Sequence, residues 1–215
     1  MEDKFFNLLK NVSPNLRMYA AAFFIATGCG FMSSLGAQTP NFVPGQVLMR
    51  FADGTPERAK VNEASRTNPP DVTSLRPVID TLSQRVGMAL SVERIGSGSW
   101  LTIAIARSPL IENVGGHLRG ENGVAAVNRQ GADLQITMDA GSALEQAFYR
   151  RSQTDTFAQV VDGWSTAAGV PLLAAAETDH LVIQIDWSAA TLELVERLNE
   201  RPEVEAAQPN YSQVR

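Results

Sequence analysis

The pattern of apolar and polar positions beyond residue 42 alternates between two periods and then repeats itself. Stretches in which apolar and polar residues alternate predict half-buried strands, whereas apolar residues three and four positions apart predict amphipathic helices. Residues 43–129 read strand, helix, strand, strand, helix, strand, and residues 131–211 read the same way. The chain is therefore expected to contain two tandem copies of one small unit of mixed helix and strand.

The first repeat opens with an alternating strand and contains a helical spacing that Gly87 closes. The segment Gly96–Ser99 predicts a hairpin turn, and the polar stretch around Asn68–Pro70 predicts a loop. The expected elements are strands at Gln46–Phe51, Ala89–Ile95, Trp100–Ala106 and Gly123–Asn128, with helices at Val72–Gly87 and from Pro109 to Leu118.

The second repeat has a longer helical stretch, Ser142–Gly169, with a break expected near Thr154–Asp155. Glu177–His180 is expected to form a turn, and Ser188 is expected to cap the last helix, which Pro202 ends. The expected strands of this repeat are Ala132–Met138, Val170–Ala176, Leu181–Asp186 and Val204–Gln208.

This order of elements predicts the fold class α+β, with two tandem ferredoxin-like βαββαβ domains. Each domain would be an antiparallel four-stranded sheet with two helices on one face, which leaves the other face free for a partner. We expect a first domain over residues 43–129, a second over 131–211, and a C-terminal tail at 212–215.

The N-terminus resembles an export signal, because the apolar run Met18–Ala26 follows basic residues and precedes small ones. Leu35–Ala37 resembles a cleavage site, which predicts a signal peptide at 1–37, a linker at 38–42 and a periplasmic or secreted protein. Lipidation of Cys29 is a weaker alternative, because the preceding residues depart from the usual lipidation motif. After cleavage the mature protein is expected to have no thiol and no membrane segment.

The composition is that of an ordinary globular protein, with 44% hydrophobic and 19% charged residues. The formal net charge of −5 disfavours nucleic acid as a partner, because phosphate binding requires a basic face. Aliphatic residues on the central strands also disfavour RNA recognition.

Little in the sequence indicates catalysis. The only histidines, His117 and His180, fall on a predicted helix and at a strand start, and Gly96–Trp100 lacks the second glycine of a nucleophile elbow. Lys60 is the only lysine beyond residue 37, and no glycine-rich loop accompanies it. We expect no enzyme activity, no metal site and no cofactor. Core or rim packing is expected for Trp100, Trp164 and Trp187.

The end of each repeat carries the most specific signal. Glu203–Tyr211, preceded by the helical Leu194–Pro202, resembles the closing strand and helix of subtilisin-family propeptides, the proteinase inhibitor domains that include the fervidolysin-like N-terminal prodomain. Leu118–Asn128 is a diverged version of the same segment, and Val43–Phe51 resembles the usual start of this family. The resemblance thus covers most of residues 43–215, as two tandem copies.

The resemblance implies that the protein inhibits a subtilisin-like serine protease. Such propeptides lay their sheet on two protease helices, and their tail enters the substrate cleft as an extended strand. Tyr211–Arg215 would be this tail, with Arg215 in the first specificity pocket and its carboxylate resembling a cleaved product. Gln208 and Asn210 stand where simpler propeptides carry acids, so the cap on the protease helices would be uncharged. The implied contact residues are Gln208, Asn210, Tyr211, Ser212, Gln213, Val214 and Arg215.

Three alternatives remain open at this point: a folding chaperone for a protease encoded elsewhere, a ferredoxin-like binding module without a protease partner, or the amino-terminal part of a longer protease precursor. The oligomeric state is also open. With no protease domain after Arg215, inhibition is expected to act in trans. Because only the second repeat ends in a tail, residues 131–215 alone are expected to retain most of the inhibition.

Overall fold

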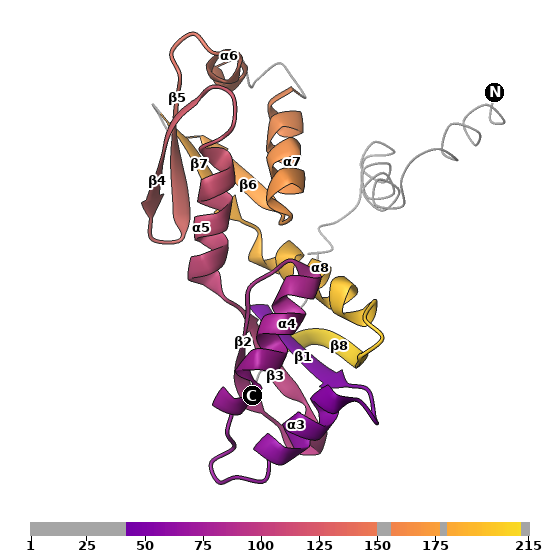
Figure 1. The fold of residues 1–215 in the computed structure, drawn as a ribbon. Coiled ribbons are helices and arrows are strands. Elements are labelled where there is room, and N and C mark those ends of the chain that lie inside the picture. Colours follow the sequence, from indigo (N-terminus) through magenta and orange to yellow (C-terminus); the bar gives the residue numbers. More distant parts are fainter. Residues whose placement is uncertain (1–41, 150–155, 177–179, 212–215) are drawn as a thin grey trace, which may run out of the picture. The chain divides into compact units, whose positions relative to one another are not determined.

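The computed structural model describes residues 42–149, 156–176 and 180–211 (Figure 1). The first half of the chain forms, in order, β1 (Phe42–Phe51), α3 (Pro56–Ala64), the 3-10 helix η2 (Thr73–Leu75), α4 (Arg76–Val86), β2 (Leu90–Ile95), the 3-10 turn η3 (Ser97–Ser99), β3 (Leu101–Ile105), α5 (Arg107–Leu118) and β4 (Val124–Gln130). The second half forms β5 (Asp133–Met138), α6 (Ala143–Tyr149), α7 (Thr156–Ala168), β6 (Leu172–Ala176), β7 (Leu181–Ile185), α8 (Trp187–Asn199) and β8 (Val204–Tyr211).

Every strand and helix predicted from the periodicity is present, with ends shifted by a few residues. Gly87 ends α4 in a left-handed conformation (φ 72°, ψ 19°), which glycine adopts without steric cost. The cap predicted for the last helix is wrong by two residues. The Asp186 side chain, rather than that of Ser188, accepts hydrogen bonds from the first backbone N–H groups of α8.

Two features of the first repeat are not predicted by the sequence pattern. Phe42, assigned to the linker, is the first residue of β1 and pairs with Tyr211. Helix α3 was missed because only Val61 and Ala64 of its residues are buried, too few to produce a clear periodicity. Its start does carry a sequence signal, since the Thr55 side chain caps the helix and Pro56 occupies the first turn.

Several predicted features lie outside the described residues. They are the signal peptide at 1–37 with Cys29, the helix break near Thr154–Asp155, most of the Glu177–His180 turn, and Ser212–Arg215. Among the helices that the structure describes, none combines the length and the apolar character needed to cross a lipid bilayer.

The strands form two four-stranded antiparallel sheets, which confirms the predicted α+β class. Sheet A has the order β2-β3-β1-β8, and sheet B has the order β4-β5-β7-β6. Helices α4 and α8 pack against sheet A, and helices α5 and α7 pack against sheet B. Each set of four strands and two helices is consistent with a ferredoxin-like arrangement.

Each sheet, however, is completed by a strand from the other repeat. Strand β8 pairs with β1, and β4 pairs with β5, so the ranges 43–129 and 131–211 do not each contain a whole sheet. The closing helix and strand of the two repeats are exchanged. The boundaries 43–129 and 131–211 therefore do not describe which strands pair.

The reason for the exchange lies in the turn between the repeats. Gln130 and Asp133 are paired, so only Gly131 and Ala132 separate β4 from β5, and Gly131 has a φ of 65°. A two-residue turn with glycine first favours a hairpin, and adjacent strands joined by such a turn pair with one another. With β4 held beside β5, the free edge of β1 is taken by β8.

Candidate functional site

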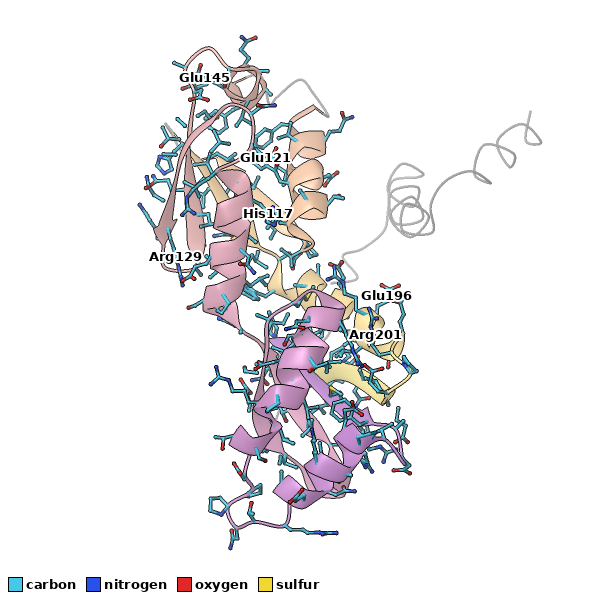
Figure 2. All side chains as sticks on the ribbon, viewed as in Figure 1. His117, Glu121, Arg129, Glu145, Glu196 and Arg201 are labelled. Carbon is cyan, nitrogen blue, oxygen red and sulfur yellow. The ribbon has the colours of Figure 1, made fainter. Side chains whose placement is uncertain are left out.

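The titratable residues of the described chain do not assemble into a recognisable reactive centre. His117 lies exposed on α5, as the helical pattern predicts, and Figure 2 shows its position on that helix. Within residues 42–149, 156–176 and 180–211, no group of three or more His, Cys, Asp or Glu side chains could hold a metal ion. The absence of enzyme activity stays a prediction.

Three of the predicted contact residues lie on β8, the edge strand of sheet A. Gln208 is exposed and pairs with Leu48 of β1, and the Asn210 side chain donates a 2.7 Å hydrogen bond to Oε1 of Gln46. Tyr211 is 54% exposed, and its ring meets Phe42 edge-on at 6.3 Å. Ser212, Gln213, Val214 and Arg215 follow this strand and lie outside the described residues.

Sheet A has one buried face and one open face. Val47, Met49 and Phe51 of β1 are at most 1% exposed and form part of the core with the helices. The alternate residues point to the other side and are exposed or half-buried, apart from Thr102 at 6%. We call this side the open face; across its strands it carries Gln46, Leu48, Arg50, Ser91, Arg94, Thr102, Ala104, Ala206 and Gln208, with Trp100 beside the start of β3.

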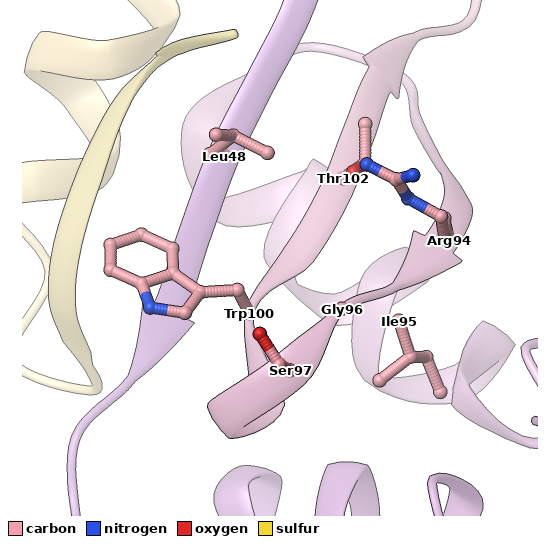
Figure 3. A pocket seen from close by; sticks show the side chains of 7 residues that line it. All are labelled: Leu48, Arg94, Ile95, Gly96, Ser97, Trp100 and Thr102. Carbon is pink, nitrogen blue, oxygen red and sulfur yellow. The ribbon is translucent and has the colours of Figure 1, made fainter.

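A hollow of about 460 Å³ lies on the open face (Figure 3). Its lining is Leu48, Arg94, Ile95, Gly96, Ser97, Trp100 and Thr102. In Figure 3, Leu48 and Trp100 lie on one side of the hollow and Arg94 lies beside Thr102 on the other. All of these residues come from β1, β2, β3 and the η3 turn, so sheet A alone builds the hollow.

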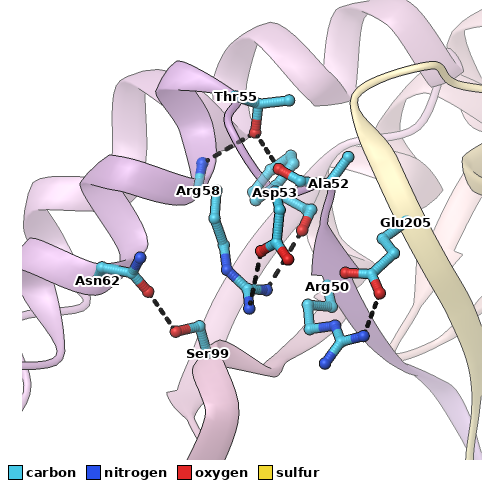
Figure 4. Close-up of polar contacts among 9 residues, drawn as sticks. Arg50, Ala52, Asp53, Thr55, Arg58, Asn62, Ser99 and Glu205 are labelled. Atoms are coloured by element: carbon cyan, nitrogen blue, oxygen red, sulfur yellow. Dashed lines mark hydrogen bonds and ion pairs between the residues drawn. The ribbon is translucent and has the colours of Figure 1, made fainter.

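The wall formed by Trp100 is held from two directions. The Arg50 guanidinium lies over the indole at 5.3 Å from its centre and also pairs with Glu205 of β8 (Figure 4). Just before Trp100, the Ser99 hydroxyl donates to the side-chain oxygen of Asn62 in α3. The unpredicted helix α3 therefore fixes the turn from which the tryptophan projects.

A second polar chain borders the open face. The Gln46 side chain donates a 2.6 Å hydrogen bond to the Glu93 carboxylate while it accepts one from Asn210. This chain runs from β2 through β1 to β8 and links the edge that carries the predicted contacts to the far edge of the sheet. Asn210 is thus a bridging residue on the surface as well as a predicted contact.

The corresponding face of sheet B is different in character. Its polar positions are mainly amides, with Gln130 donating to Gln135 at 2.8 Å and Gln184 donating to Asp133 at 3.1 Å. Asn128 lies opposite Gln135, in the position on β4 that Gln208 has on β8. Asn128 on sheet B and Gln208 on sheet A therefore occupy equivalent positions, but the side chains around them differ.

Sequence reasoning missed the residues of the hollow. The tryptophans were all expected to pack in or beside a core, which is confirmed for Trp164 at 4% exposure. It is also confirmed for Trp187, which is partly buried and packs against the core at the start of α8, with the Arg107 guanidinium over its ring. Trp100, in contrast, lines an open hollow. The alternation in β1 does contain a signal, since Leu48 is an apolar residue on the polar side of the strand.

No protein-family model, no curated protein and no solved structure matches this chain. The resemblance to subtilisin-family propeptides therefore stays a prediction from the residues quoted above, chiefly Glu203–Tyr211 and Val43–Phe51.

Proposed function

We propose that this protein inhibits a subtilisin-like serine protease, using the open face of sheet A and the tail that follows β8. The observation that carries the proposal is that β8, the strand that residues 212–215 follow in the sequence, also contributes to the open face. Strand β8 is an edge strand that ends at Tyr211, and its residues Ala206 and Gln208 lie on the open face.

The chemistry of inhibition would be occlusion of the cleft. An extended segment after Tyr211 can pair with a free strand of a protease through its main chain, while side chains occupy successive pockets. The sheet supplies the second contact and holds the segment in place, which lowers the entropy lost when the tail binds. Arg215 would occupy the first specificity pocket.

The test is to measure inhibition constants against a panel of subtilisin-like proteases. The variants are the full chain, a deletion of residues 212–215 and Arg215→Asp; Arg66→Asp is the matched control, an exposed arginine outside the proposed contacts. The deletion should weaken inhibition about tenfold or more, equivalent to ~1.4 kcal/mol. Equal constants for all four proteins would rule out the tail, and inhibition of no protease would rule out the function.

A second pair of variants tests the sheet. Gln208→Arg places a charge on the open face of sheet A, and Asn128→Arg places the same charge at the matched position of sheet B. Only Gln208→Arg should weaken inhibition. Equal effects of the two substitutions would contradict the assignment of the contact to sheet A.

A further inference from the structure

The hollow on the open face has an apolar interior and one charged residue in its lining. Leu48 and the indole of Trp100 supply the apolar surface, whereas Ile95 and Thr102, which also line the hollow, are only 8% and 6% exposed. Arg94 is the only charged residue that lines it. An apolar concavity with a single fixed charge favours a ligand of matching polarity and shape.

The charge of Arg94 is not used within the described chain. Arg94 is exposed, and its side chain makes no hydrogen bond or ion pair with any residue that the structure describes. The neighbouring cation, Arg50, is already neutralised by Glu205. Glu93, the nearest acid in sequence, accepts from Gln46.

Trp100 gives the hollow a preformed aromatic wall. Its indole is fixed by Arg50 on one side and by the Ser99–Asn62 contact at the turn, so little side-chain freedom remains to be lost on binding. Aromatic rings pack against one another in offset or edge-on geometry and gain about 0.5–1.5 kcal/mol beyond the burial of area.

We propose that the hollow is an anchor site for an aromatic side chain of a partner protein that lies next to an acidic residue. The ring would pack against Leu48 and Trp100 on one side of the hollow, and the neighbouring carboxylate would pair with Arg94 on the other. This inference rests on the proposed function in one respect, because the partner that the hollow would anchor is the protease bound to the open face. The anchor chemistry itself can be tested without a protease.

The probe is the capped dipeptide acetyl-Asp-Phe-amide, added to the full ¹⁵N-labelled chain. The indole N–H signal of Trp100 is identified as the one lost in Trp100→Phe. Acetyl-Asn-Phe-amide and acetyl-Asp-Ala-amide remove the carboxylate and the ring in turn. The Trp100 and Arg94 signals should shift saturably with the first peptide, and both controls should bind about fivefold more weakly.

Arg94→Gln should reduce the affinity for acetyl-Asp-Phe-amide to that for acetyl-Asn-Phe-amide, and Arg66→Gln should leave it unchanged. Because Arg94 is exposed and unpaired, this variant should keep the native spectrum. Absence of saturable binding, or equal affinity for the Asp and Asn peptides, overturns the proposal.

The two proposals fail in different ways. If the peptide binds but no protease is inhibited, the hollow stands and the inhibitor function falls. If the chain inhibits a protease, the peptide does not bind and Arg94→Gln leaves the inhibition constant unchanged, then the function stands and the hollow is not the anchor.

Discussion

The backbone N–H of Gly45 in β1 donates a 2.6 Å hydrogen bond to Oγ1 of Thr191 in α8, a residue 146 positions further along the chain. Thr191 is fully buried, and its hydroxyl in turn donates to the Trp187 carbonyl at 2.6 Å. Gly45 has a φ of 86° at an irregularity in the pairing of β1 with β8, where a side chain would be strained. This hydrogen bond thus attaches α8, a helix of the second repeat, to β1, the first strand of the first repeat.

Thr191→Val should destabilise the protein by about 1–3 kcal/mol, because it keeps the volume of the side chain and leaves the buried Gly45 N–H without an acceptor. Urea denaturation followed by circular dichroism measures the change. Thr102→Val is the matched control: Thr102 is also buried, but no hydrogen bond joins its hydroxyl to another described residue, so the cost should stay within about 0.5 kcal/mol. Equal stabilities of the two variants would contradict the role of the Gly45–Thr191 bond.

Engineered cysteines test the exchange of strands directly. Leu48 and Gln208 are opposite one another on β1 and β8, so Leu48→Cys with Gln208→Cys should form an intrachain disulfide. If each repeat closed its own sheet, Leu48 would instead lie opposite Asn128, the matched position on β4. Leu48→Cys with Asn128→Cys should therefore remain reduced, and Cys29→Ser is included in both proteins. Peptide mapping of the oxidised chains distinguishes the two pairings, and a 48–128 bond would show that the exchange is wrong.

The sequence predicts the elements far better than it predicts their neighbours. Alternation in Gln46–Phe51 determines which side chains of β1 face the core, and the same holds for the other strands. The closing strands, however, share one pattern: Val124-Ala-Ala-Val-Asn and Val204-Glu-Ala-Ala-Gln fit equally well beside β1 or β5. A periodicity describes the faces of a strand and says nothing about the strand beside it.

The lengths of the links between strands and helices do not show either whether each closing strand pairs within its own repeat or with the other repeat. One residue joins β3 to α5 and one joins β7 to α8, so both closing units leave their sheets through links of equal length. The informative signal is Gly131-Ala132, which makes β4 and β5 a hairpin. For the candidate site, the β8 contacts follow from a motif, whereas the hollow needs Leu48, Arg94 and Trp100 from three strands or turns to meet. Whether these three side chains lie close together depends on the register in which the strands pair, and a single sequence does not determine that register.

The exchange changes what an isolated repeat should do. Residues 131–215 contain β8 and the tail but lack β1, with which β8 pairs, and lack β4 beside β5. We now expect this fragment alone to inhibit at least about tenfold more weakly than the full chain, contrary to the expectation from the repeat alone. Adding residues 42–130 should restore inhibition by completing both sheets. Full inhibition by the fragment alone would mean that β8 can close on its own repeat.

An ion pair between Glu203 and Arg85 connects the turn that leads into β8 to helix α4. The Glu203 side chain is 11% exposed, and one of its oxygens lies 2.5 Å from the Arg85 guanidinium of α4. Burial raises the pKa of this carboxyl, but hydrogen bonds from its own backbone N–H and from Arg85, together with the charges of Arg85 and Arg201, outweigh burial and hold the pKa below the ordinary value of 4.5. The ionised form is therefore favoured by folding.

A carboxyl with a lowered folded-state pKa stabilises the protein at pH values above its unfolded-state pKa, and this stabilisation disappears as the pH falls through the folded-state value. Glu203→Gln should cost about 1 kcal/mol at pH 7, since Arg85 is half exposed, and the difference from the unsubstituted chain should shrink below about pH 4.5. Urea midpoints measured from pH 7 to pH 3 give the two curves. Glu63→Gln, at an exposed position of α3 with no side-chain partner among the described residues, should run parallel to the unsubstituted chain. If the urea midpoints of Glu203→Gln also change with pH in parallel with those of the unsubstituted chain, the Arg85–Glu203 contact does not contribute pH-dependent stability.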